Sequence, residues 1–130
     1  MNKYKTQQKL AELLEEVEFH EAVLDEINDL VLKKGIVAQF IRIFEKNIAL
    51  IKELGKSVTA TKNFETLRGA EGLCSMKFKG KDMNLRMLYS YDESSNTIFL
   101  HLFYERDDSS NESYKKHISI AKKRMNEREE

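Results

Sequence analysis

The apolar residues in the first part of the chain follow the spacing of helices. Across residues 9–32 they recur every three or four positions with acidic residues between them, which predicts an amphipathic helix. Residues 17–20 break this rhythm, so the region is either one long helix or two pieces separated by a short strand or a bend. Gly35 marks its end, and a second apolar stripe predicts a helix over residues 36–54. Together they predict an antiparallel helical hairpin.

The pattern changes to a period of two after residue 72. Residues 73–78 and 84–91 alternate between apolar and polar side chains on either side of a polar turn that contains a glycine. This arrangement predicts a β-hairpin. Residues 56–68 show no period and are expected to form a connecting loop.

A third predicted strand, residues 97–105, follows a second polar turn and is apolar on both faces. Strict alternation places Leu100 and Leu102 on one face and His101 and Phe103 on the other. Such a strand is expected in the middle of a sheet or beneath a helix. A histidine there is more often a hydrogen-bonded core residue than a proton carrier.

A final helix is predicted over residues 114–126, after an acidic, serine-rich stretch that offers amino-terminal caps. Lysines and an arginine between its apolar positions form a cationic face. The order of elements predicts an α+β fold in which an amino-terminal helical hairpin packs on a three-stranded antiparallel meander with a carboxy-terminal helix. The length of 130 residues predicts one domain, residues 1–130.

Composition narrows the classes of function. The chain is 41% hydrophobic and 34% charged, as expected of a soluble globular domain. Cys74 is the only cysteine, which excludes an intramolecular disulfide and a zinc site built on thiolates, and suits a reducing cytoplasm. Alternation places its side chain with apolar neighbours, as a small core residue. We expect no signal peptide, no membrane span and no metal, nucleotide or other cofactor.

A net charge of zero conceals a segregation of charge along the chain. Residues 56–90 carry seven basic and three acidic side chains, and residues 111–124 carry five and one. Residues 91–110 carry one basic and five acidic side chains. The two basic segments are candidate contacts for a polyanion.

Three segments resemble the RelE/ParE superfamily of type II toxins, in particular its HigB-like, phage-derived branch. They are residues 63–78 (NFETLRGAEGLCSMKF), residues 84–89 (NLRMLY) and residues 98–104 (IFLHLFY). Ala121 and Arg124 fit the alanine and arginine of the family's last helix. The resemblance covers residues 18–126 and leaves residues 1–17 as a helical extension.

The resemblance implies a RelE-like fold and a cytoplasmic toxin that cleaves messenger RNA on the ribosome without a metal. It also implies an antitoxin protein as partner. Cleavage by attack of the 2′ hydroxyl needs a base, cations around the phosphate and an acid. Lys77 and Arg86 occupy the family's basic strand positions on one strand face, and His101 or Tyr104 is the candidate for proton exchange. Candidate RNA and phosphate contacts are Lys79, Lys81, Arg106, Lys115, Lys116 and Arg124.

Acidic residues after the third strand depart from the family's pattern. Glu105, Asp107 and Asp108 stand where the HigB-like branch usually has a pair of lysines, and acids beside a phosphate site weaken it by repulsion. A non-enzymatic interaction or regulatory protein on the same fold is therefore one alternative, and a gyrase inhibitor like those of the ParE branch is another. The apolar helical stripes are core, or in part a groove for an antitoxin helix or for a second copy in a homodimer.

Overall fold

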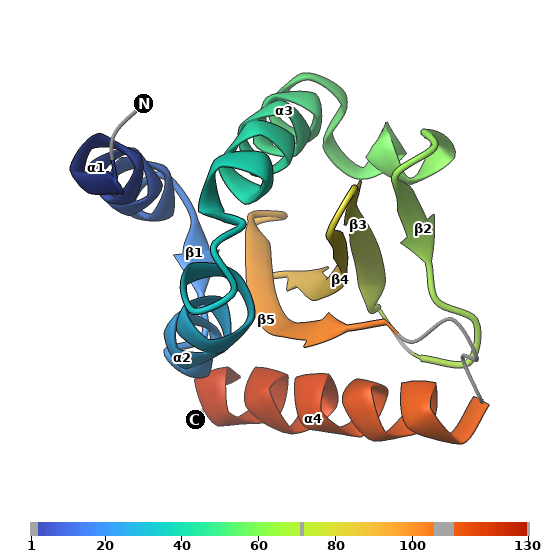
Figure 1. Ribbon diagram of the computed structural model, residues 1–130. Coiled ribbons are helices and arrows are strands. Elements are labelled where there is room, and N and C mark those ends of the chain that lie inside the picture. Colours follow the sequence, from blue (N-terminus) through green and yellow to red (C-terminus); the bar gives the residue numbers. More distant parts are fainter. Residues whose placement is uncertain (1–2, 71, 106–110, 130) are drawn as a thin grey trace.

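The computed structural model describes residues 3–70, 72–105 and 111–129, and its centre is a five-stranded mixed sheet (Figure 1). The strands lie in the order β1-β5-β4-β3-β2. Only β1 is parallel to its neighbour β5, and the other neighbours are antiparallel. The strands span Glu18–Phe19 (β1), Phe64–Thr66 (β2), Cys74–Gly80 (β3), Met83–Tyr91 (β4) and Thr97–Tyr104 (β5).

Helices cover both faces of this sheet (Figure 1). One face packs against the first three helices and a π-helical turn, and the last helix, α4, runs across the other face. The helical elements are α1 (Lys3–Glu15), α2 (Ala22–Ile27), the π-helical turn η1 (Asn28–Leu32), α3 (Val37–Leu54), the 3-10 helix η2 (Gly55–Ala60) and α4 (Asn111–Glu129).

The larger core lies between α3 and the sheet. Phe40 and Phe44 of α3 are fully buried, and the Phe40 ring stacks on Phe78 of β3 with 4.5 Å between centroids. Phe44 contacts the edge of Phe99 on β5 at 5.5 Å. These aromatic contacts join the predicted helix stripe to the predicted strand faces.

A smaller core lies beneath α4. Leu88 and Phe103 from the sheet pack against Ala121, and Tyr114 contacts the Phe103 ring edge-on at 5.6 Å. The two cores together bury both faces of β5, as its sequence predicts.

A β-bulge shifts the register between β4 and β5. Leu88 pairs with His101 and Tyr89 pairs with Phe99, so Leu100 has no partner on β4. Leu100 belongs to the smaller core, beneath α4, whereas Leu102 belongs to the larger one. The expectation that Leu100 and Leu102 share a face is therefore wrong, because the extra residue reverses the alternation.

The structure corrects two parts of the predicted fold. Of the two alternatives for the first helical region, the structure shows two pieces separated by a short strand, β1, so a simple amino-terminal hairpin does not describe it. The sheet has five strands, because β1 and β2 flank the predicted meander of β3, β4 and β5, and the expected loop at residues 56–68 contains η2 and β2. Strands of two and three residues are too short to show alternation in a sequence.

Candidate active site

Lys77 on β3 and Arg86 on β4 stand directly opposite each other in the antiparallel register. Opposite residues project from the same face of a sheet, so both belong to the face of Ser75 and Leu88, which α4 covers. The sequence predicts this side-by-side arrangement of the two cations, and the register confirms it.

Two carboxylates hold the Arg86 guanidinium. Arg86 Nε donates a hydrogen bond of 2.6 Å to Glu105 Oε2, and Nη1 donates one of 3.1 Å to Glu65 Oε1. Nη1 also lies 3.3 Å from Ser75 Oγ, to which the Tyr114 hydroxyl donates at 3.5 Å. The Arg86 and Glu105 side chains are only 14% and 17% exposed, whereas Glu65 is 52% exposed. Arg86 therefore has one inner and one outer anionic partner.

Burial and charge act in opposite directions on this cluster. Burial opposes the charged form of Arg86, but the hydrogen bond to Glu105 and the nearby acids outweigh it, so the pKa of Arg86 is raised. Burial raises the pKa of Tyr114 as well, more than its bond to Ser75 and the charge of Arg86 lower it. At neutral pH the cluster holds a cationic arginine beside a neutral tyrosine hydroxyl.

Four of the other predicted phosphate contacts are exposed lysines. Lys79 and Lys81 are exposed at the turn between β3 and β4, and Lys115 and Lys116 are exposed near the start of α4. Arg106 lies outside the described residues, as do Asp107 and Asp108.

The structure does not bring Tyr104 and Arg86 to one face. Tyr104 is 54% exposed, and it pairs with Leu85, whose side chain belongs to the larger core beneath α3. Its ring lines a separate pocket of about 460 Å³ with Leu30 and Ile36. Tyr104 therefore lies across the sheet from the cation pair.

His101 is the centre of a second cluster, which joins α2, β5 and α4. Its Nδ1 lies 2.6 Å from Glu26 Oε2, and its Nε2 lies 2.7 Å from His117 Nδ1. The Leu102 backbone N–H donates to Glu26 Oε1 at 2.9 Å, and Arg124 Nη1 donates to both carboxylate oxygens at 2.9 and 3.0 Å. His101 is 5% exposed, so it is a hydrogen-bonded core histidine.

This second cluster also determines where Arg124 points. Arg124 donates to the Leu100 carbonyl as well as to Glu26. Ten residues of α4, a rise of about 15 Å, separate it from Tyr114, which lies beside Ser75. Arg124 is thus bound within the fold, away from Lys77 and Arg86.

Two groups of the second cluster, Glu26 and His117, have lowered pKa values. Burial alone would raise the pKa of Glu26, but the bonds from His101 and Leu102 and the charge of Arg124 outweigh it, so this pKa is lowered. Burial, followed by the charges of His101 and Lys116, lowers the pKa of His117 to about 4. His117 is therefore neutral at pH 7.

A family model matches most of this chain. Residues 31–126, roughly three quarters of the chain, match the family model described as phage derived protein Gp49-like (DUF891). The chain belongs to the Gp49-like family. This family is of the RelE/HigB-like toxin type and is associated with the toxins of toxin–antitoxin pairs. Neither the search of curated proteins nor that of solved structures found a match.

The match starts after the first quarter of this Gp49-like chain. It includes Lys77, Arg86 and the whole meander, and also His101 and Arg124. Glu26, which binds both His101 and Arg124, precedes it. The carboxylate of the second cluster is therefore supplied by a segment outside the matched region.

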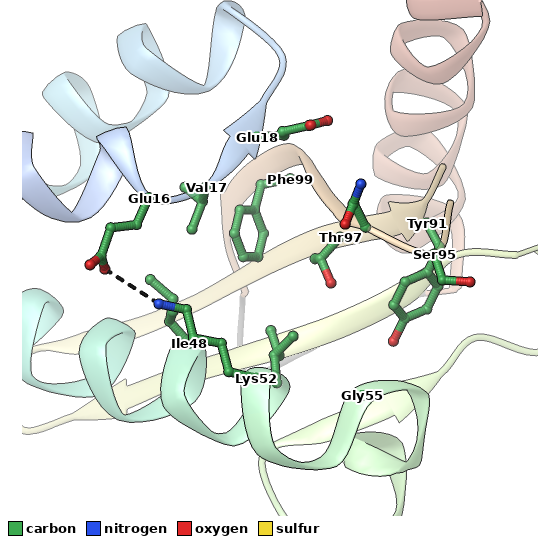
Figure 2. Close-up of a pocket in the computed structure, with 12 residues that line it drawn as sticks. Glu16, Val17, Glu18, Ile48, Lys52, Gly55, Tyr91, Ser95, Thr97 and Phe99 are labelled. Carbon is green, nitrogen blue, oxygen red and sulfur yellow. Dashed lines mark ion pairs between the residues drawn. The ribbon is translucent and has the colours of Figure 1, made fainter. Parts of the chain in front are cut away.

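A pocket of about 400 Å³ lies at the other end of the Gp49-like fold (Figure 2). Val17, Ile48 and Phe99 supply apolar lining, and Lys52 reaches across its rim toward Glu16 at 3.9 Å. None of the predicted site residues lines this pocket.

Among residues 3–70, 72–105 and 111–129, no group of three or more His, Cys, Asp or Glu side chains could hold a metal ion. Within those same ranges, no helix has the length and apolar character needed to cross a membrane.

The contact between His101 and His117 and their link to Glu26 were not predicted from the sequence of this Gp49-like chain. The spacing of residues in α4 does contain a signal for the side of the helix that carries His117. Tyr114, His117, Ala121 and Arg124 follow at steps of three and four, so they lie on one helix face, the face toward the sheet.

Cys74 is buried as predicted, and burial raises the pKa of its thiol despite hydrogen bonding to neighbours.

Proposed function

We propose that this Gp49-like protein is the toxin of a type II toxin–antitoxin pair and that it cleaves messenger RNA on the ribosome. The observation that carries the proposal is the Lys77 and Arg86 pair, two cations at opposed positions of neighbouring strands beside the start of α4. Such a pair can bind one phosphate through charge-assisted hydrogen bonds. The toxin-type family supports the same conclusion.

The proposal assigns the basic residues to two tasks. Lys77 and Arg86 bind the phosphate at the cleaved bond and stabilise the charge that develops on it. The exposed side chains of Lys79, Lys81, Lys115 and Lys116 contact flanking phosphates, where each exposed lysine adds to affinity and to its dependence on salt. The partners are the ribosome with its messenger RNA, and an antitoxin protein that blocks this face.

Induced expression in a bacterium tests the proposal. The wild-type chain is expected to arrest growth and to truncate transcripts, whereas the double variant Lys77→Ala, Arg86→Ala made at the same soluble level is expected to do neither. Normal growth and intact transcripts with soluble wild-type protein would exclude the nuclease. Accumulated DNA breaks with intact transcripts would instead select a gyrase inhibitor. A small helix-turn-helix protein encoded by the neighbouring reading frame would support the antitoxin.

One observation favours a second candidate, an interaction or regulatory protein without enzymatic activity. Glu105 and Glu65 neutralise Arg86, so a phosphate would meet two carboxylates around that guanidinium. This candidate predicts that the double variant of Lys77 and Arg86 leaves messenger RNA as intact as the wild type does. Any cleavage that depends on these two residues would refute it.

A further inference from the structure

The proposed cleavage needs a proton acceptor beside Arg86, and the residues predicted for it are elsewhere. Both ring nitrogens of His101 are engaged, one with Glu26 and one with His117, and its ring is buried. Tyr104 lies across the sheet. Within the described part of the chain, the closest proton acceptor to Arg86 is the carboxylate of Glu105, at 2.6 Å.

We propose that Glu105 is the general base of this reaction, the group that removes the proton from the attacking 2′ hydroxyl of RNA. The inference rests on the proposed function and adds a catalytic residue to it. The acid that departs from the family's pattern thereby becomes the group that the chemistry requires.

The structure holds Glu105 firmly against Arg86. The Glu105 backbone N–H donates to the Asn84 carbonyl at 2.9 Å, and Asn84 Nδ2 donates to the Glu105 carbonyl at 2.7 Å. Arg86 Nε binds the oxygen Oε2 at 2.6 Å. Among the described residues no hydrogen bond is made to Oε1, which is the oxygen that can accept a hydroxyl proton.

The order of the strands puts residues 105 and 77 on opposite sides of Arg86. Glu105 directly follows β5, Arg86 is on the middle strand β4, and Lys77 is on β3. In the proposed reaction, a phosphate bound to Arg86 lies between the Glu105 carboxylate and the Lys77 side chain. In-line displacement at phosphorus needs this arrangement, because the attacking and leaving oxygens are on opposite sides.

In the proposed cleavage, Glu105 accepts one proton and Lys77 donates another. The 2′ hydroxyl gives its proton to Glu105 Oε1 while the 2′ oxygen forms its bond to phosphorus. The bond from phosphorus to the 5′ oxygen breaks, and that oxygen takes a proton from the Lys77 ammonium. The products are a 2′,3′-cyclic phosphate and a free 5′ hydroxyl, and solvent then returns the proton from Glu105 to Lys77.

Glu65 provides a matched comparison on the same guanidinium. It binds Arg86 at 3.1 Å from the edge strand β2, but its side chain is 52% exposed, so solvent competes for its carboxylate. A phosphate that displaces Glu65 gains access to Nη1 while Nε remains bound to Glu105. The two carboxylates are thus expected to have opposite effects on the rate.

Cleavage of a defined messenger RNA on purified ribosomes tests the assignment. The measurements are the cleavage rate at pH 7 and the chemical identity of the new 3′ ends, for the wild type, Glu105→Gln and Glu65→Gln. Glu105→Gln is expected to lower the rate by about 10² to 10⁴-fold, because an amide cannot take the proton from the 2′ hydroxyl. Glu65→Gln is expected to raise the rate a few-fold, because one anion fewer opposes the phosphate.

The outcomes separate this inference from the proposed function. Urea unfolding of both variants ensures that they are folded, and glutamine at position 105 can still accept the Arg86 hydrogen bond. Wild-type cleavage that persists or rises in Glu105→Gln, or an equal loss in both variants, would overturn the role of Glu105 and leave the nuclease in place. A wild type that leaves ribosome-bound messenger RNA intact would remove both.

Discussion

The Glu26 carboxylate is expected to be one of the largest single electrostatic contributions to stability in this protein. In Glu26→Ala, the Leu102 N–H loses its acceptor, and His101 and Arg124 lose their anionic partner. Removing one partner from a buried ion pair typically costs about 3–5 kcal/mol, because the other charge remains buried. Glu26 and Arg124 retain some contact with solvent, so we expect a loss of about 3 kcal/mol in the free energy of unfolding.

Urea unfolding measures this loss. With a slope of about 2 kcal/mol/M for a domain of this size, the midpoint should fall by about 1.5 M without a change of slope. Asp25→Ala is the matched control, since Asp25 is an exposed acid on the same helix, and it should stay within about 0.5 kcal/mol of the wild type. If Glu26→Ala cost no more than Asp25→Ala, the cluster would not be the link between α2 and α4 described here.

Two further predictions concern the protonation of α4 and the packing of α3. The lowered pKa of His117, about 4, means that its neutral form is favoured by folding, so stability is constant above the ordinary pKa of 6.5 and falls as the pH drops from 6.5 to 4. After allowance for solvent screening the loss is about 1–2 kcal/mol, and urea midpoints at pH 7.5 and 5 should converge in His117→Gln. Phe40→Ala removes a fully buried ring stacked on Phe78 and should cost about 3–5 kcal/mol, whereas Ala38→Gly on the exposed side of the same helix should cost about 1 kcal/mol in thermal or urea unfolding.

The long periodic elements were predictable because each has one dominant pattern. The stripe of α3 is continuous, and the alternation of β3 and β4 is interrupted only at Leu88. The structure confirms these elements and the pairing of the two strands. The sequence predicts β1 only as one of two possibilities, a short strand or a bend, and does not predict β2 at all, since neither strand contains enough residues for a period. The bulge at Leu100 was hidden as well, because β5 is apolar on both faces and a change of alternation leaves no mark in such a sequence.

The candidate site was predictable only where neighbours in the sequence become neighbours in the sheet. Lys77 and Arg86 flank one turn, so the hairpin pattern predicts that they share one face of adjacent strands, and the register of the structure puts them opposite each other. The partners of Arg86 come from positions 65, 75 and 105, and Tyr114 joins them through Ser75, so their convergence depends on the strand order and on the path of α4. Local pattern carries no information on such distant contacts, which is why Glu105 appeared in the sequence only as an unfavourable charge.

The position of α4 after the sheet in the sequence has a consequence for how the protein is made. Leu88 and Phe103 leave the ribosome well before Ala121 and the other α4 residues that pack in the same core. The nascent chain therefore exposes one apolar face of its sheet until α4 has been synthesised. Premature stop codons ahead of α4 are expected to yield insoluble fragments rather than smaller working proteins.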